Sequence, residues 1–185
     1  MGVLTDEKKR FSYQDYLKTP EDKRYELIEG ELVMTPSPVP YHQWVAMNIA
    51  FEIREFVKRN DMGKVFLSPC DVYLDDENVL QPDILFISNE RINIIGEKNI
   101  QGAPDLVIEI LSENTAYTDM VKKKRLYARF GVKEYWIVAT GEKTVEVYSL
   151  KGGAFVLERS YSKDFILESP LLVGLKIGLS VVFEF

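Results

Sequence analysis

Two short apolar segments of the sequence each carry one carboxylate, at Asp83 and at Glu109. The first segment reads QPDILFIS and the second DLVIEILS. Burying an ionised carboxylate among apolar side chains is costly unless a partner neutralises it. Two such carboxylates with an ammonium group nearby are typical of a site that holds a divalent cation, so we predict metal-assisted chemistry. The alternatives are a solvated strand start for Asp83 and a structural ion pair for Glu109.

The ammonium group is predicted to come from the segment DMVKKKRLYARF, which follows Glu109. At helical spacing, one apolar stripe contains Ala116, Met120, Leu126, Tyr127 and Phe130. Lys123 lies in the middle of this stripe, and Asp119 lies one turn earlier on the same side. Such a lysine extends to water, pairs with Asp119, or reaches a buried carboxylate. We predict that Lys123 reaches a buried carboxylate. Lys122, Arg125 and Arg129 are expected to project from the other side of the helix, to water.

A third carboxylate is expected from a hairpin near the start of the chain. In YELIEGEL, strand alternation places Glu26 on the face of Ile28 and opposite Tyr25 and Leu27. Together with the two strand carboxylates, Glu26 becomes a candidate ligand for a metal ion or a water molecule.

These side chains need a sheet and helices to bring them together. The expected elements are a helix at 12–18, a hairpin turning at Glu29-Gly30, a helix at 41–60, strands at 64–67 and 71–74, the two acid-bearing strands, a helix at 115–130 ended by Gly131, and the strands EYWIVA, TVEVYSL and AFVLERSY. Residues 89–104 are expected to be irregular. ILFI, LVIEIL and YWIVA are apolar on both faces, which is typical of the covered centre of a sheet. We therefore predict an α/β (mixed α+β) fold with a central mixed β-sheet flanked by helices and additional antiparallel strands.

Composition narrows the classes of function. The chain has 185 residues, 46% of them hydrophobic and 28% charged, which favours one globular domain over residues 1–185. A net charge of −6 weighs against a basic, non-specific nucleic-acid binder, although a local basic patch can serve. Cys70 has no partner for a disulfide, and the single His42 excludes a multi-histidine zinc site. No run approaches the roughly 18 apolar residues of a membrane helix, so a cytoplasmic protein without membrane contact is expected.

The acid-bearing blocks together resemble the PD-(D/E)XK nuclease superfamily, and more closely its Uma-two family of restriction endonuclease-like proteins. Pro82-Asp83 is similar to the PD element, and Glu109 to its acidic partner. Leu111 stands where the superfamily has a lysine. In the Uma-two family that the chain resembles, this lysine lies on the following helix. The family's pattern of Asp, Lys and Tyr at four-residue spacing matches Asp119, Lys123 and Tyr127. Two alternatives stay open: Lys122 or Lys124 as the lysine, and Pro104-Asp105 as a competing PD.

The resemblance implies a restriction endonuclease-like fold and a nuclease that uses Mg²⁺ or Mn²⁺ to hydrolyse nucleic acid, DNA in particular. Its implied metal ligands are Asp83, Glu109 and the backbone carbonyl of Ile110, and Lys123 and Glu26 join the catalytic set. His42 and Gln81 are implied to lie near the cleft; a surface or capping role is the alternative for His42. The implied substrate contacts are Lys122, Lys124, Arg125 and Arg129.

Two other functions compete with this one. A nuclease-fold domain without catalytic activity would bind nucleic acid or protein, and its buried charges would be a structural Asp–Glu–Lys cluster. A homo-oligomer would instead use apolar side chains of the strand-rich C-terminal part, namely Phe155, Tyr161, Phe165, Val181, Val182 and Phe183. Because small self-pairing interfaces are common, a homodimer is expected.

Overall fold

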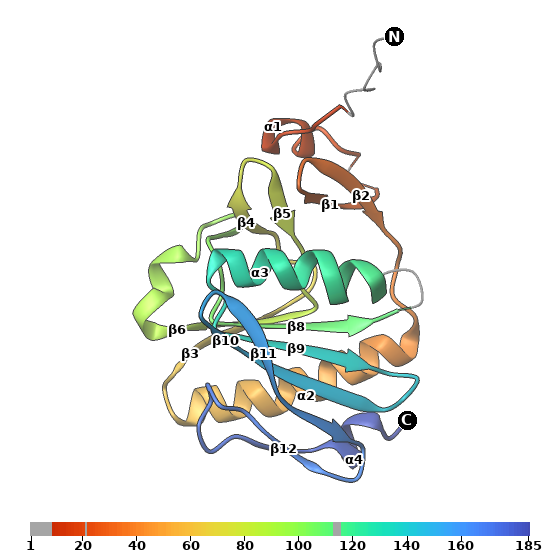
Figure 1. The fold of residues 1–185 in the computed structure, drawn as a ribbon, viewed down its shortest axis with the longest axis vertical. Coiled ribbons are helices and arrows are strands. Elements are labelled where there is room, and N and C mark those ends of the chain that lie inside the picture. The colour runs from red at the N-terminus through yellow and green to blue at the C-terminus, as the bar shows by residue number, and fades with distance from the viewer. Residues whose placement is uncertain (1–8, 21, 113–115) are drawn as a thin grey trace.

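A computed structural model describes residues 9–20, 22–112 and 116–185, and within them the central element is a six-stranded mixed sheet (Figure 1). Its strand order is β11-β10-β9-β8-β6-β3. The strands are β3 (Gly63–Leu67), β6 (Ile84–Ser88), β8 (Leu106–Leu111), β9 (Glu134–Ala139), β10 (Thr144–Lys151) and β11 (Ala154–Ser162). Strands β8 and β9 are parallel and the other neighbours antiparallel, so the predicted mixed central sheet is confirmed.

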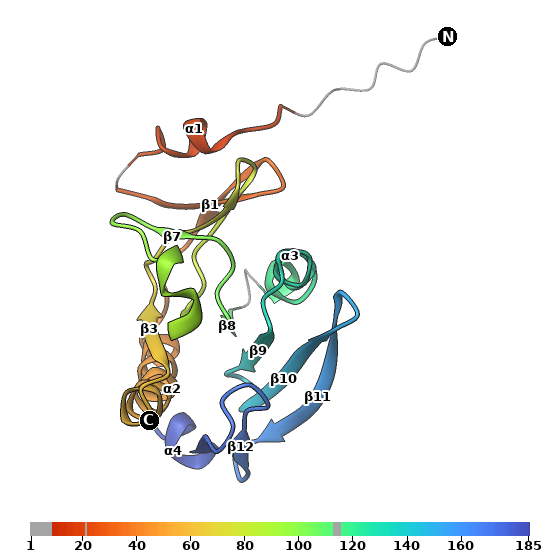
Figure 2. The same cartoon turned by 90° about the vertical axis from the view of Figure 1, so that its left-hand side faces the viewer.

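The three strands that read as apolar on both faces lie at the centre of this sheet. β6, β8 and β9 are neighbours, and nearly all of their residues are buried. A sheet covered on both sides needs apolar residues at successive positions, because each face packs against another layer. Helices α2 and α3 supply these layers and lie on opposite sides of β8 and β9 (Figure 2).

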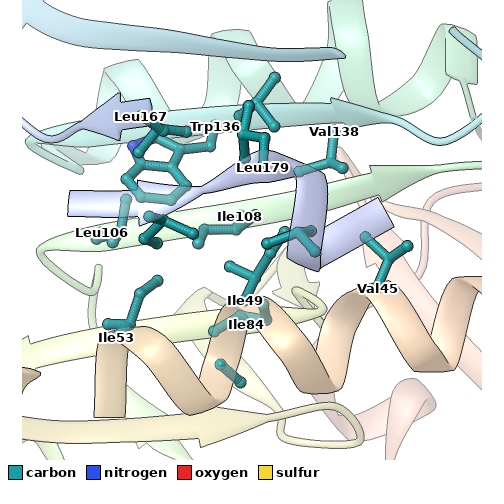
Figure 3. Packing of buried hydrophobic residues seen from close by; sticks show 14 of the residues in the cluster. Val45, Ile49, Ile53, Ile84, Leu106, Ile108, Trp136, Val138, Leu167 and Leu179 are labelled. Atoms are coloured by element: carbon teal, nitrogen blue, oxygen red, sulfur yellow. The ribbon is translucent and has the colours of Figure 1, made fainter. Parts of the chain in front are cut away.

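The long helix α2 (Pro40–Arg59) covers one face of the sheet. Figure 3 shows Val45, Ile49 and Ile53 of α2 packed toward Ile108 and the neighbouring strands. Their spacing of four residues places them on one side of the helix, as predicted. The same layer is completed by β12 (Ile166–Glu168), β13 (Lys176–Gly178) and α4 (Leu179–Phe183).

The opposite face packs against a helix and a second, smaller sheet. The helical part consists of a π-helical turn, η2 (Thr118–Lys123), followed by α3 (Lys124–Phe130). Gly131 ends α3 in the left-handed conformation at φ 84°, as expected of a helix stop. Residue 115, the predicted start of this helix, lies outside the described residues.

The smaller sheet carries the predicted N-terminal hairpin. Its order is β2-β1-β5-β4-β7, and its strands are β1 (Arg24–Ile28), β2 (Glu31–Thr35), β4 (Val72–Asp75), β5 (Asn78–Leu80) and β7 (Ile100–Gln101). Glu29 and Gly30 form the turn with φ 51° and 76°, as a two-residue hairpin requires. The β4–β7 pair is parallel, so the added strands are not all antiparallel as expected. Strands β5 and β7 were not predicted, because both are too short to show alternation.

Two short helical segments complete the description, α1 (Tyr13–Tyr16) and the 3₁₀ turn η1 (Asn89–Ile94), the latter within the span expected to be irregular.

Among the C-terminal apolar residues considered for self-association, Tyr161, Val182 and Phe183 are core residues, whereas Phe165 and Val181 are exposed. Within the described ranges, no helix combines the length and apolar character needed to cross a membrane.

Candidate functional site

A cleft of about 1420 Å³ opens where the start of α2, the end of β8, η2 and the edge of the smaller sheet meet. The predicted side chains that line this cleft are His42, Gln81, Asp83, Glu109, Asp119 and Lys123, together with Ile110. These residues were predicted from four separate segments of the sequence. The tertiary structure brings them into one place.

Lys123 is the centre of a buried charge cluster. Its Nζ lies 2.9 Å from Glu26 Oε1, 3.2 Å from Glu109 Oε1 and 3.1 Å from Asp119 Oδ1. All four side chains are at most 5% exposed. The prediction that Lys123 reaches a buried carboxylate is therefore confirmed, and its pairing with Asp119 occurs as well. Lys122 and Lys124 do not take this place.

The π-helical turn determines how Asp119 and Lys123 face the cleft. The backbone N–H of Lys124 bonds the carbonyl of Asp119 five residues earlier, and the Tyr135 hydroxyl donates to the same carbonyl at 3.0 Å. The additional residue in the turn rotates the preceding side chains away from a regular helical stripe. As a result Met120 is 46% exposed, and its predicted place in the apolar stripe is wrong.

Glu26 is fixed from the smaller sheet. Strand alternation places it on the face of Ile28 as predicted, and its side chain is 5% exposed. Its Oε1 also accepts the backbone N–H of Gln81 at 2.7 Å. Gln81 thus connects the hairpin carboxylate to the Pro82-Asp83 segment, which gives it a positioning role at the edge of the cleft.

Asp83 and the Ile110 carbonyl form a second group on the cleft side of β8. Asp83 Oδ2 accepts the Ile110 N–H at 2.8 Å and lies 3.3 Å from His42 Nε2. His42 Nε2 is 3.0 Å from the Ile110 carbonyl oxygen, and since a carbonyl only accepts, this nitrogen carries the proton. His42 Nδ1 is buried without a hydrogen-bond partner among the described residues.

The cluster shifts the proton affinities of its members in physically consistent directions. Burial raises the pKa of Glu109 well above its ordinary value, and the charges of neighbouring acids add to this, although Lys123 opposes the shift. Burial likewise raises the pKa of Glu26. Burial would lower the pKa of Lys123, but Glu109, Glu26 and Asp119 outweigh it and raise this pKa well above its usual value. Lys123 is therefore a permanent cation at neutral pH and cannot act as a general base.

His42 is also biased toward its charged form. Burial acts to lower the pKa of this imidazole, but its hydrogen bond to Asp83 and the charge of that carboxylate raise the pKa overall. The predicted place of His42 beside the cleft is observed, and the capping alternative is not, since the N-terminal cap of α2 is Val39.

Tyr127 holds Glu109 from the side away from the cleft. Its hydroxyl donates to Glu109 Oε1 at 2.8 Å, and its ring is fully buried against Tyr135. Lys123 and Tyr127 thus both bond Glu109, and Asp119 pairs with Lys123, which agrees with the grouping of these three residues that the family resemblance implied.

We expect Tyr127→Phe to lower the free energy of unfolding by about 2 kcal/mol, because the buried carboxylate loses a hydrogen bond that nothing replaces. Urea denaturation followed by circular dichroism measures this change. Tyr148→Phe is the matched control, since Tyr148 also donates to a glutamate, at 2.6 Å, but in a partly exposed place. If both variants lost the same free energy of unfolding, the hydrogen bond of Tyr127 to the buried cluster would contribute no more than a partly exposed one.

The donor atoms of the cleft fit a hard divalent cation. Asp83 and Glu109 offer carboxylate oxygens and Ile110 a carbonyl oxygen, the ligand types that Mg²⁺ and Mn²⁺ prefer. In the part of the chain that the structure describes, no three His, Cys, Asp or Glu side chains form a ready metal-binding group. For a metal ion held here, the carbonyl of Ile110 and water molecules would have to complete the ligand set.

The basic residues expected to contact substrate have acidic or aromatic partners and do not line the cleft. The pairs are Lys122 with Glu31 at 3.3 Å, Arg125 with Glu29 at 2.6 Å, Arg129 with Asp75 at 3.7 Å, and Lys124 above the ring of Tyr148 at 3.3 Å. Most of these pairs join the helical segment to the smaller sheet.

The competing Pro104-Asp105 has a structural role. Asp105 is completely buried, accepts the Ser88 N–H at 2.8 Å and lies 2.7 Å from Lys133 Nζ. It lies at the start of β8, whereas Glu109 lies near the end of this strand, and it does not line the cleft. Of the two aspartates, Asp83 is therefore the one that lines the cleft together with Glu109.

Arg24 lines the cleft from the start of β1 and was not among the predicted site residues. Its guanidinium donates to Gln81 Oε1 at 3.2 Å and to Ser68 Oγ at 2.6 Å. Strand alternation was the available signal, because Arg24 precedes Glu26 by two residues and shares its face.

Comparisons with known proteins found a family and a similar fold for this chain. A family model described as "Uma2: Putative restriction endonuclease" matches residues 13–181. A solved structure described as a "putative nuclease belonging to DUF820", from Anabaena variabilis ATCC 29413, is similar in fold with a TM-score of 0.76. It is 24% identical, and the match covers 94% of this chain and 97% of that chain. A comparison with curated proteins gave no match.

Proposed function

Since the chain belongs to the Uma2 family of restriction endonuclease-like proteins, we propose that it hydrolyses phosphodiester bonds of nucleic acid, DNA in particular, with Mg²⁺ or Mn²⁺ as cofactor. Both the fold and the family support a nuclease. The ion, the substrate and the roles of individual residues are part of the proposal.

One observation carries this proposal: the cleft holds more acidic groups than its basic groups can neutralise. Glu26, Glu109 and Asp119 surround the single ammonium of Lys123, and Asp83 lies beside His42. Buried negative charge of this kind is costly, as the raised pKa of Glu109 shows. Binding of a divalent cation between Asp83, Glu109 and the Ile110 carbonyl would offset that cost.

A bound Mg²⁺ or Mn²⁺ supplies Lewis-acid polarisation of a phosphoryl oxygen and lowers the pKa of a coordinated water. Lys123 contributes a fixed positive charge that stabilises developing negative charge on the phosphate, because three carboxylates hold its ammonium in place. Glu26 and Asp119 position Lys123, and Tyr127 positions Glu109. The strand pairing and the turn η2 thus preorganise the charges before substrate binds.

We expect the purified protein to bind Mn²⁺ and to cleave a labelled DNA strand only when Mg²⁺ or Mn²⁺ is present. Calorimetry measures the binding, and gel electrophoresis of the products measures cleavage with and without EDTA. Absence of both Mn²⁺ binding at about millimolar concentration and cleavage would contradict the proposal. That outcome would favour a domain of nuclease fold whose charges form a structural cluster.

Three further expectations stay predictions of the sequence: DNA rather than RNA as substrate, a homodimer, and a cytoplasmic location. The exposed side chains of Phe165 and Val181 support the homodimer by offering apolar surface at the C-terminal part. Light scattering of the purified protein measures the oligomeric state directly.

A further inference from the structure

We infer that the cleft takes an unpaired nucleic-acid strand, whose phosphate is bound by Arg24 and whose base packs on the apolar wall around Trp44. This inference deepens the proposed function by naming the form of its substrate. It depends on two features that the charge cluster does not use: an arginine without an acidic partner, and a set of exposed apolar side chains that line the same cleft.

Arg24 differs from the other basic residues near the site in what it contacts. Lys123 has three carboxylate partners, and Lys122, Arg125 and Arg129 each have one. Arg24 instead donates to neutral acceptors, the Gln81 amide oxygen and the Ser68 hydroxyl. Within the described residues no carboxylate pairs with it. Its positive charge is therefore available to an anion that enters the cleft.

The contacts of Arg24 also orient its guanidinium. Nε and Nη2 both donate to Gln81 Oε1 at 3.2 Å, and Nη2 donates to Ser68 Oγ at 2.6 Å. Gln81 is itself fixed, since its amide nitrogen donates to Asp71 Oδ1 at 2.8 Å. Nη1 has no acceptor in the described part of the chain, which leaves a planar donor for a phosphate oxygen. The backbone of Gln81 bonds Glu26, so this phosphate site lies next to the catalytic cluster.

An apolar wall completes the cleft at the start of α2. Six exposed apolar side chains line the cleft, and four of them form this wall: Val39, Trp44, Met47 and Phe185, with Leu67 and Met120 elsewhere in the lining. The Trp44 indole N–H donates to the Glu184 carbonyl, which holds the ring in place while 39% of the residue stays exposed. Aromatic and apolar surfaces of this kind bind the faces of nucleobases, and only bases outside a duplex present these faces.

The charge balance favours an unpaired strand over a duplex. Duplex binding depends on several phosphate contacts to lysine and arginine. Arg24 and Lys123 are the only lysine or arginine residues among the described residues that line the cleft, and the chain carries a net charge of −6. A strand that gains affinity from stacking needs fewer phosphate contacts. The cleft therefore suits one strand with a base on the Trp44 wall and a phosphate at Arg24.

Fluorescence anisotropy tests this inference with a labelled DNA or RNA oligonucleotide, either single-stranded or annealed to its complement, in EDTA so that no cleavage occurs. We expect the wild-type protein to bind the single strand at least about tenfold more tightly than the duplex. Arg24→Gln should weaken single-strand binding by about tenfold and reduce the slope of log K against log salt by about 0.7. Trp44→Ala should weaken binding by a similar factor without changing that slope.

Matched controls come from the outer side of α2. Arg54→Gln and Phe51→Ala remove an exposed arginine and an exposed aromatic ring that do not line the cleft, and we expect both to bind like wild type. Arg24→Lys keeps the charge but loses the planar fork, so it should recover part of the affinity and all of the salt slope. Thermal unfolding of each variant verifies that the fold is intact.

Three results would overturn the inference: equal or tighter binding of duplex, an unchanged salt slope in Arg24→Gln, or equal losses in the control variants. The proposed function is tested separately by metal-dependent hydrolysis of bis(p-nitrophenyl) phosphate, a small diester without bases. If the diester is hydrolysed and single strands are not bound, only the inference fails. If single strands bind through Arg24 and neither substrate is hydrolysed, only the proposed catalysis fails.

Discussion

Glu109→Gln is expected to reduce metal-dependent phosphodiester hydrolysis by about a thousandfold, which corresponds to about 4 kcal/mol of transition-state stabilisation. Glu109 is the strand carboxylate that faces both the cleft and Lys123, so under the proposed function its charge would bind the metal ion as well as hold the ammonium in position. The amide keeps the size of the side chain and can still accept the Tyr127 hydroxyl. The fold should therefore persist while the negative charge is lost. Initial rates of strand cleavage with Mg²⁺ measure the effect.

Asp83→Asn is expected to have a similar effect on hydrolysis, because Asp83 is the other carboxylate proposed to hold the ion. Glu52→Gln is the matched control, since Glu52 is exposed on α2 and does not line the cleft. Calorimetry with Mn²⁺ should show weaker binding for both site variants and wild-type binding for the control. Cleavage at the wild-type rate by Glu109→Gln and Asp83→Asn would refute the assignment of these carboxylates.

Lys123→Met is expected to have the largest effect on stability. The substitution keeps most of the aliphatic volume but leaves Glu26, Glu109 and Asp119 buried without their shared ammonium. Removing one partner of a buried ion pair costs about 3–5 kcal/mol. We therefore expect the free energy of unfolding at neutral pH to fall by about this amount. Chemical denaturation monitored by tryptophan fluorescence measures it, because Trp136 is fully buried.

The loss of stability in Lys123→Met should be smaller at acid pH than at neutral pH. The pKa values of Glu26 and Glu109 are raised in the folded protein, so above the ordinary carboxyl pKa the folded state binds more protons than the unfolded state. The free energy of unfolding then falls as pH rises through this window, up to the raised pKa values. Lys123 lowers the pKa values of both glutamates, so replacing Lys123 raises these pKa values and extends the pH window to higher pH. The variant should accordingly regain stability between about pH 8 and about pH 5, with a steeper slope than wild type.

Lys122→Met provides the comparison for this experiment. Lys122 is the preceding residue, but its partner Glu31 and its own side chain are both about one-third exposed, at 36% and 34%. Exposed pairs of this kind contribute at most about 1 kcal/mol, so the loss should be small and nearly independent of pH. If both variants lose the same stability, or if Lys123→Met is no more stable in acid than at neutral pH, the buried cluster does not have the energetic role proposed for it.

The sequence alone determined the central sheet and most of the acidic site. Three segments that are apolar on both faces required a sheet covered on both sides, and Glu109 was conspicuous because it is the one charged residue within them. Lys123 followed from the helical spacing of its neighbours, and Glu26 from strand alternation. These inferences succeeded because the cost of burying charge and the direction of side chains along an element are both local properties of the sequence.

Only the tertiary structure decided which basic residues are free to meet a substrate. Lys122, Arg125 and Arg129 read as available cations, but the smaller sheet brings Glu31, Glu29 and Asp75 to them. Arg24 read as an ordinary residue of a hairpin, but its neighbours in the fold are neutral. Likewise the π-helical turn at Thr118–Lys123, which exposes Met120, cannot be found by assuming a regular helical period. A charge is neutralised by whatever the fold places within a few ångströms of it, and for these residues the neighbours come from distant parts of the chain.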